Sequence, residues 1–98
     1  MDDNNNLRGT VVENVAGSRF EMAFPGGHAF ASFRRDGDRL IVTHVEVPSA
    51  FNGRGLGSLL VRGVFEMARA SRRRVVPACP FAADWARRHP DFSDVLAR

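Results

Sequence analysis

Residues 51–63, FNGRGLGSLLVRG, separate two different hydrophobic patterns and decide how the chain folds. Before this stretch apolar residues tend to recur at every second position, and after it they recur at helical spacing. The stretch itself holds four glycines in thirteen residues. Glycine in a helix costs about 1 kcal/mol relative to alanine. Such a cost at several neighbouring positions indicates that the function of this stretch depends on backbone atoms left uncovered by side chains.

The residues before this stretch predict four strands joined by short turns. The strands are expected over 19–24, 28–34 and 39–47, preceded by one over 7–15. The sequence RDGD at 35–38 is typical of a tight hairpin, because Asp-Gly suits the positive dihedral angles of such turns. Four strands with short connections predict an antiparallel meander.

The residues after Pro48 predict a helix that ends near Ser71. Its apolar face follows the spacing i, i+3, i+4, i+7, i+8 and i+11, formed by Leu56, Leu59, Leu60, Gly63, Val64 and Met67. A glycine within this face indicates close packing of the helix on the sheet. Residues 74–79 then predict a fifth strand. A strand–helix–strand order favours a right-handed crossover, which places this strand parallel to the fourth.

The C-terminal part predicts a second helix, begun by Pro80 and extending over 81–89. Phe81 and Trp85 are interpreted as core residues of this helix, with the wall of a pocket as the alternative. Ser93 is the expected cap of a short terminal turn. The fold class is therefore a mixed α+β domain: an antiparallel meander, a helical crossover, a parallel fifth strand and a C-terminal helix.

The composition predicts one soluble domain over 7–98 with a frayed polar tail over 1–6. Cys79 is the only cysteine, so no intramolecular disulfide is possible, and a cytoplasmic location is expected. The N-terminus does not resemble a signal peptide, and no apolar run is long enough for a membrane helix. The net charge is +3, and every basic residue is arginine, which leaves nucleic-acid binding as an alternative function.

The glycine-rich loop 52–58 predicts an anion site. It lies at the first turn of a helix, where backbone N–H groups have no internal partners and the helix dipole favours negative charge. It is not a Walker loop, because no Gly-Lys-Ser/Thr ends it, and a dinucleotide-binding fold does not begin with an antiparallel meander. A strand-to-helix turn with incidental glycines is the alternative.

These features together resemble the GNAT superfamily of acyl-CoA-dependent N-acyltransferases. The resemblance rests on the order HVEVP, NGRGLG, amphipathic helix and PACPF. The sequence CPFAADWARRHPDF at 79–92 is similar to a minimal, single-domain branch, the YjdJ type. The family motif has Arg or Gln, two residues, Gly, one residue, then Gly or Ala. Gly55 and Gly57 match it, whereas Asn52 stands in place of Arg or Gln.

The resemblance implies that acetyl-CoA is the co-substrate and an amine the acceptor, either a small amine or a protein lysine. It implies that the pyrophosphate binds at the loop and that the pantetheine arm pairs with the end of the fourth strand. Arg54 is expected to supply the charge that Asn52 lacks. The implied cofactor-binding residues are Val45, Val47, Asn52, Gly53, Arg54, Gly55, Leu56, Gly57 and Ser58.

Three further residues are candidates for catalysis. Cys79 precedes the proline that begins a helix, and a helix N-terminus favours the nucleophilic thiolate. The branch resemblance implies an acetyl-cysteine intermediate at this residue. A buried, inert cysteine is the alternative. His44 and Glu46 share one face of a strand and together can accept a proton from an ammonium. A solvated polar sheet face is the alternative.

No metal site is predicted, because Cys79 has no Cys-x-x-Cys partner and the histidines lack ligand spacing. Membrane binding is not expected. An acetyltransferase is the function that the sequence favours. An acyl-CoA-binding module with little turnover is the second candidate, and an arginine-rich nucleic-acid-binding domain is the third. Binding of acetyl-CoA separates the first two from the third, and acetyl transfer separates the first from the second.

Overall fold

A computed structural model describes residues 10–97 of the chain. One five-stranded sheet, in the order β1-β2-β3-β4-β5, carries the fold. The elements are β1 (Val11–Asn14), β2 (Arg19–Phe24), β3 (Gly27–Asp36), β4 (Arg39–Glu46), the 3-10 turn η1 (Ser49–Phe51), α2 (Leu56–Ala70), β5 (Arg74–Pro77), α3 (Pro80–Arg88) and the 3-10 turn η2 (Pro90–Val95). The expected tail over 1–6, and the first residues of the strand expected from residue 7, lie outside the described residues.

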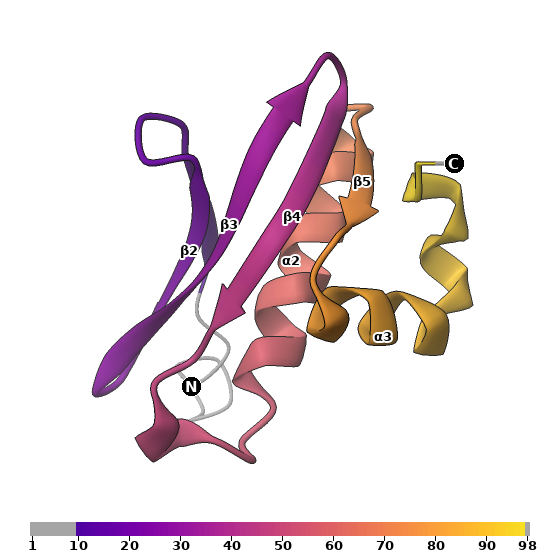
Figure 1. The fold of residues 1–98 in the computed structure, drawn as a ribbon. Helices are drawn as coiled ribbons and strands as arrows, with labels where there is room; N and C mark the ends of the chain where they lie inside the picture. The colour runs from indigo at the N-terminus through magenta and orange to yellow at the C-terminus, as the bar shows by residue number, and fades with distance from the viewer. Residues whose placement is uncertain (1–9, 98) are drawn as a thin grey trace.

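The sheet has the predicted topology (Figure 1). The first four strands pair antiparallel in sequence order, and β4 and β5 pair in parallel. The parallel register runs from Arg39 opposite Arg74 to Val42 opposite Pro77. Gly37 has a φ of 63° in the turn between β3 and β4, as the Asp-Gly hairpin predicts. The prediction that the fourth and fifth strands are parallel neighbours is therefore confirmed.

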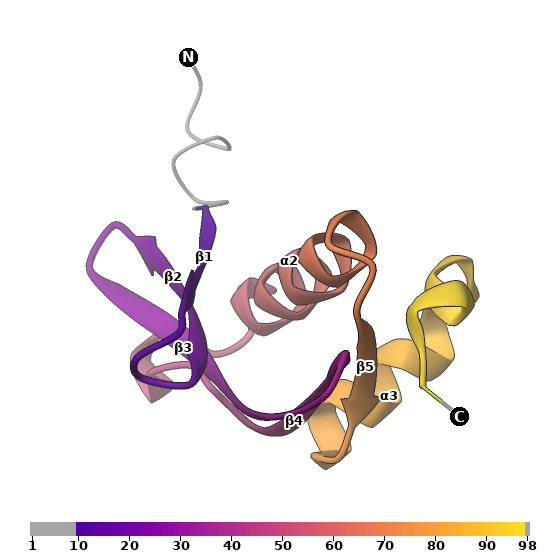
Figure 2. The same ribbon diagram turned by 90° about the horizontal axis from the view of Figure 1, so that it is seen from above.

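Helix α2 lies in the concave side of the curved sheet, and α3 lies beyond β5 (Figure 2). The apolar face of α2 contributes Leu60, Val64 and Phe65 to one continuous core that also holds Phe20 and Met22 of β2. Each large side chain buried in this way stabilises the fold by about 1.5–3 kcal/mol. Within the described residues, no helix has the combination of length and apolarity needed to cross a membrane.

Gly63 confirms the expected close contact of helix and sheet. A Cβ atom at this position would lie 2.3 Å from Cγ2 of Val11 and 2.8 Å from its Cβ, far inside van der Waals contact. Only glycine therefore lets α2 approach β1 this closely.

The structure corrects four details of the sequence prediction. Strand β3 extends through Asp36 because Arg35 and Asp36 pair with β4, and β5 ends at Pro77, before the predicted residue 79. The C-terminal residues form η2, which begins at Pro90, so Ser93 lies inside the turn and does not cap it. Phe81 is 47% exposed and does not belong to the core; it lines a cavity beside Gly57, which is the alternative that the sequence left open. Trp85 is buried, as predicted.

One residue of β4 interrupts the strand pairing. Ser32 lies opposite His44 and Phe33 lies opposite Val42, so Thr43 has no partner in β3 and forms a bulge. Because successive side chains point to opposite faces of a sheet, the extra residue exchanges the two faces. Leu40 and Val42 face the core before the bulge, and Val45 and Val47 face the same side after it.

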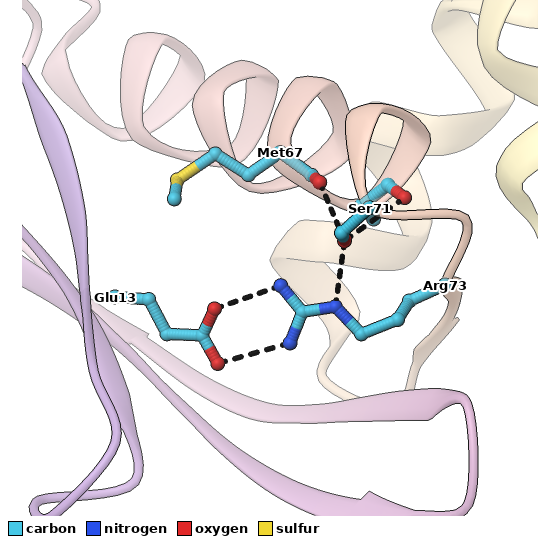
Figure 3. A network of polar contacts seen from close by, with 5 residues as sticks. Glu13, Met67, Ser71 and Arg73 are labelled. Carbon is cyan, nitrogen blue, oxygen red and sulfur yellow. Dashed lines mark hydrogen bonds and ion pairs between the residues drawn. The ribbon is translucent and has the colours of Figure 1, made fainter.

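A polar network connects the edge strand β1 to the junction of α2 and β5 (Figure 3). The guanidinium of Arg73 donates to both carboxylate oxygens of Glu13, at 2.9 and 2.7 Å, and its Nε donates to the Ser71 hydroxyl at 2.7 Å. That hydroxyl in turn donates to the Met67 carbonyl at 2.8 Å. The Arg73 hydrogen bonds, opposed by partial burial, hold the pKa of Glu13 below its usual range. The network adds an ionic attachment of β1 to its packing against Gly63.

Candidate acyl-donor site

A cavity of about 500 Å³ lies where the end of β4, the start of α2 and one side of α3 meet. In Figure 1 this is the lower end of α2, next to α3. Its lining includes all but one of the predicted binding residues, namely Val45, Val47, Asn52, Gly53, Gly55, Leu56, Gly57 and Ser58. Arg54, the remaining one, lies in the same loop and places its guanidinium 5.4 Å from the centre of the Phe51 ring.

The glycine loop has a backbone shape that glycine permits. Gly53 and Gly55 have φ values of 80° and 77°, in the left-handed region where side chains are disfavoured. Leu59 is the first residue of α2 whose N–H bonds back to a carbonyl, that of Gly55 at 3.1 Å. Among the described residues, no backbone carbonyl accepts the N–H groups of residues 53–58. These donors and the helix dipole make the N-terminal end of α2 a candidate site for an anion.

Gly57 has a different role from the two glycines before it. A Cβ at Gly57 would lie 2.9 Å from Cζ of Phe81, which lines the cavity from α3. The glycine therefore lets the first turn of α2 come close to the first turn of α3.

The sheet opens beside this cavity. Pairing between β4 and β5 ends at Val42, whose carbonyl accepts the N–H groups of both Ala78 and Cys79, at 2.9 and 3.1 Å. Strand β4 continues to Glu46 without pairing to β5 (Figure 1). Its edge near Val45 and Val47 can therefore pair with an extended, amide-bearing ligand.

Cys79 lies at the point where the two strands separate. It is 7% exposed and is the N-cap of α3, where its Sγ accepts the N–H of Ala82 at 3.4 Å. The cavity lining does not include Cys79, although Phe81, two residues later, is part of it. The thiol thus lies at a helix N-terminus and outside the cavity lining.

His44 and Glu46 lie together, on the other face of the sheet. Their side chains are 57% and 54% exposed, and Nε2 of His44 lies 2.7 Å from Oε1 of Glu46. Val45 and Val47 line the cavity, so the alternation of the strand turns His44 and Glu46 away from it. The structure therefore pairs these two residues with each other and separates them from the loop by the thickness of the sheet.

Helix α3 adds charged groups and a histidine that the sequence did not assign to the site. Asp84, Arg88 and His89 line the cavity, and the carboxylate of Asp84 forms ion pairs with Arg87 and Arg88. Their helical spacing from Phe81 (i+3, i+7 and i+8) was the signal that could have found them. Residues 10–97 contain no group of three or more His, Cys, Asp or Glu side chains arranged to hold a metal ion.

Comparison with known proteins agrees with this architecture. The profile of a family described as GCN5-related N-acetyl-transferase matches residues 19–95. This range covers most of the chain, so the protein belongs to the GCN5-related N-acetyltransferase family. No curated protein gives a significant match to the sequence.

A solved structure with the same fold is a GCN5-like candidate N-acetyltransferase from Staphylococcus aureus. It shares 22% sequence identity with this chain and superposes with a TM-score of 0.69, over 94% of this chain and 89% of that one. The likeness establishes the common fold.

Proposed function

We propose that the protein transfers an acetyl group from acetyl-CoA to an amine, either a small amine or an exposed protein lysine. The observation that carries this proposal is the row of unpaired N–H groups over residues 53–58, beside a cavity that borders the opening between β4 and β5. Membership of an acetyltransferase family supports it. The cavity volume of about 500 Å³ is that of a site for a small molecule.

The acyl donor binds in an extended form along this cavity. Its pyrophosphate accepts hydrogen bonds from the loop N–H groups, and the pantetheine amides pair with the edge of β4 at Val45 and Val47. Asn52 is neutral where the family motif allows Arg, and Arg54 supplies a positive charge two residues later. The ring of Phe51 attracts the Arg54 guanidinium and so holds it at the loop.

The reaction takes place where β4 and β5 separate, next to Cys79. The Cys79 thiolate attacks the thioester carbonyl, a C–S bond to Cys79 forms, and the bond to the CoA sulfur breaks as that thiolate leaves and takes up a proton. The amine then attacks the acetyl-cysteine, which forms the C–N bond and releases the Cys79 thiolate. Glu46, paired with His44, accepts the proton that the amine loses, so the acceptor approaches from the face opposite the donor.

Mass spectrometry after exposure to acetyl-CoA tests this mechanism. The expected result is an increase of about 42 Da on Cys79, the mass of one acetyl group on a nucleophile in covalent catalysis. The adduct is absent in Cys79→Ala and Cys79→Ser, and turnover collapses in both. Direct attack of the amine on acetyl-CoA predicts no adduct and a loss of about 10²-fold or less in Cys79→Ala. Binding of acetyl-CoA without transfer to any amine indicates a CoA-binding module instead.

A further inference from the structure

Trp85 of α3 and Ser58 of α2 are joined by a hydrogen bond across the cavity wall. The indole Nε1–H of Trp85 donates to Oγ of Ser58 at 2.8 Å, and both residues line the cavity. Trp85 is 4% exposed. A buried indole N–H left without a partner costs free energy, so this bond holds the ring in one orientation.

Neighbouring side chains also fix the Trp85 ring. His89 stacks on it with ring centres 3.8 Å apart and an interplanar angle of 13°. Nδ1 of His89 lies 2.7 Å from the Trp85 carbonyl, which ties that imidazole to the helix. Phe65 packs at 5.1 Å between ring centres. The direction from which the indole N–H reaches Ser58 is therefore set by the packing of α3.

This bond determines what the Ser58 hydroxyl can do. An indole N–H is only a donor, so the Ser58 oxygen accepts and its own proton must point elsewhere. In the part of the chain that the structure describes, no group accepts this proton. Ser58 is the third residue of α2, beside the unpaired N–H groups of the glycine loop. The free proton is therefore available to an anion bound there.

We propose that Trp85 is a positioning residue for the acyl donor: it orients the Ser58 hydroxyl so that this hydroxyl donates a hydrogen bond to the pyrophosphate. The inference rests on the proposed function, because it takes acetyl-CoA as the ligand of the cavity. It assigns to a buried tryptophan of α3 a role in ligand affinity, beyond its contribution to the core.

The test compares two ligands. Calorimetry gives the affinity for acetyl-CoA, and NMR titration gives the affinity for S-acetylpantetheine, which lacks the pyrophosphate. Loss of a hydrogen bond to a charged group predicts that Ser58→Ala binds acetyl-CoA about tenfold more weakly. Ser58→Thr keeps the hydroxyl and keeps most of the affinity. Trp85→Phe binds acetyl-CoA several-fold more weakly, and neither Ser58→Ala nor Trp85→Phe changes the affinity for S-acetylpantetheine.

A double variant separates positioning from a structural effect. If Trp85 acts through Ser58, Trp85→Phe causes no further loss of acetyl-CoA affinity in the Ser58→Ala background. The exposed Ser93→Ala is the matched serine control and binds like the wild type. Melting temperatures identify any variant that is unfolded. If Trp85→Phe is unfolded, the comparison of Ser58→Ala with Ser58→Thr tests the proposal by itself.

Three results overturn the inference while acetyl transfer stands: wild-type acetyl-CoA affinity in Ser58→Ala, equal losses for the two ligands, or additive losses in the double variant. A wild-type protein that does not bind acetyl-CoA overturns the inference and the proposed function together.

Discussion

Val11 of β1 and Gly63 of α2 are in contact so close that no side chain fits at position 63. A methyl group at that position would lie 2.3 Å from the nearest Val11 carbon. Gly63→Ala is therefore expected to destabilise the protein, although alanine favours a helix by about 1 kcal/mol over glycine. Overpacking of a rigid, β-branched neighbour typically costs about 1–3 kcal/mol. Chemical denaturation measures the net change.

The partner residue supplies the control for this prediction. Val11→Ala makes room for the new methyl group, so the double variant Gly63→Ala/Val11→Ala should be more stable than the sum of the two single changes predicts. Additive free energies of unfolding contradict the contact as the cause.

Glu13 is expected to make stability depend on pH in the acid range. Its hydrogen bonds from Arg73 lower its pKa in the folded state below the ordinary value of 4.5. Its contribution to stability is therefore complete above that value and is lost as the pH falls through the lower, folded-state pKa. In Glu13→Gln, the free energy of unfolding should fall less steeply below about pH 4.5 than in the wild type.

A residual slope is expected in that variant. Hydrogen bonds from Arg69 lower the pKa of Asp94 in the same direction. Glu21→Gln is a suitable control because Glu21 lies on the neighbouring strand, outside the Arg73 network. If the free energy of unfolding falls equally steeply with pH in the wild type and Glu13→Gln, the Glu13–Arg73 pair does not cause the loss of stability in acid.

Gly55 is expected to matter for ligand binding through its backbone conformation. A left-handed conformation costs a residue with a side chain about 1–2 kcal/mol, so Gly55→Ala should distort the loop. Distortion moves the N–H groups away from the pyrophosphate, and the affinity for acetyl-CoA should fall about tenfold. Calorimetry measures this loss.

Gly37→Ala is the matched control for that variant. Gly37 also has a positive φ and open space around its Cβ position, but it lies in the hairpin between β3 and β4. The Gly37→Ala variant should lose a similar amount of stability and keep its affinity for acetyl-CoA. Equal affinities in the two variants are incompatible with a pyrophosphate site at the loop.

Glu46 and His44 are expected to affect turnover without affecting donor binding. They lie on the face opposite the cavity, so Glu46→Gln and His44→Ala should keep the affinity for acetyl-CoA. Removal of a general base lowers kcat by about 10²–10⁴-fold, and the pH–rate profile should change. Glu21→Gln, a further carboxylate of the sheet, should have the wild-type rate. An unchanged pH–rate profile in both variants contradicts the assignment.

Much of the fold follows from local patterns and handedness. The alternation in residues 19–24 predicted the bounds of β2, and the Asp-Gly turn predicted the hairpin after β3. The parallel pairing of β4 and β5 followed from the right-handed crossover through α2. These features depend on backbone geometry that neighbouring residues determine.

The site was harder to predict from the sequence than the fold. The sequence singled out the loop residues, because glycines at a helix N-terminus have a physical reason to bind an anion, and most of these residues line the cavity. Phe81 and Trp85 were considered as a pocket wall only as the alternative to core residues, and Asp84 and Arg88 were not predicted, since docking of the whole helix decides which of its side chains reach the site. The Trp85–Ser58 bond joins residues 27 positions apart and has no local signature.

The bulge at Thr43 changes which residues of β4 face the core. Up to Val42 the even-numbered residues face the core, and from Val45 onward the odd-numbered residues do. If Thr43 were paired and the strand alternated strictly from Val42 onward, His44 and Glu46 would face the helix side and the two valines would face water. Deletion of Thr43 would instead remove the extra residue and leave both pairs on their present faces. One residue without a pairing partner thus determines which side of the sheet carries the charged pair and which carries the apolar wall of the cavity.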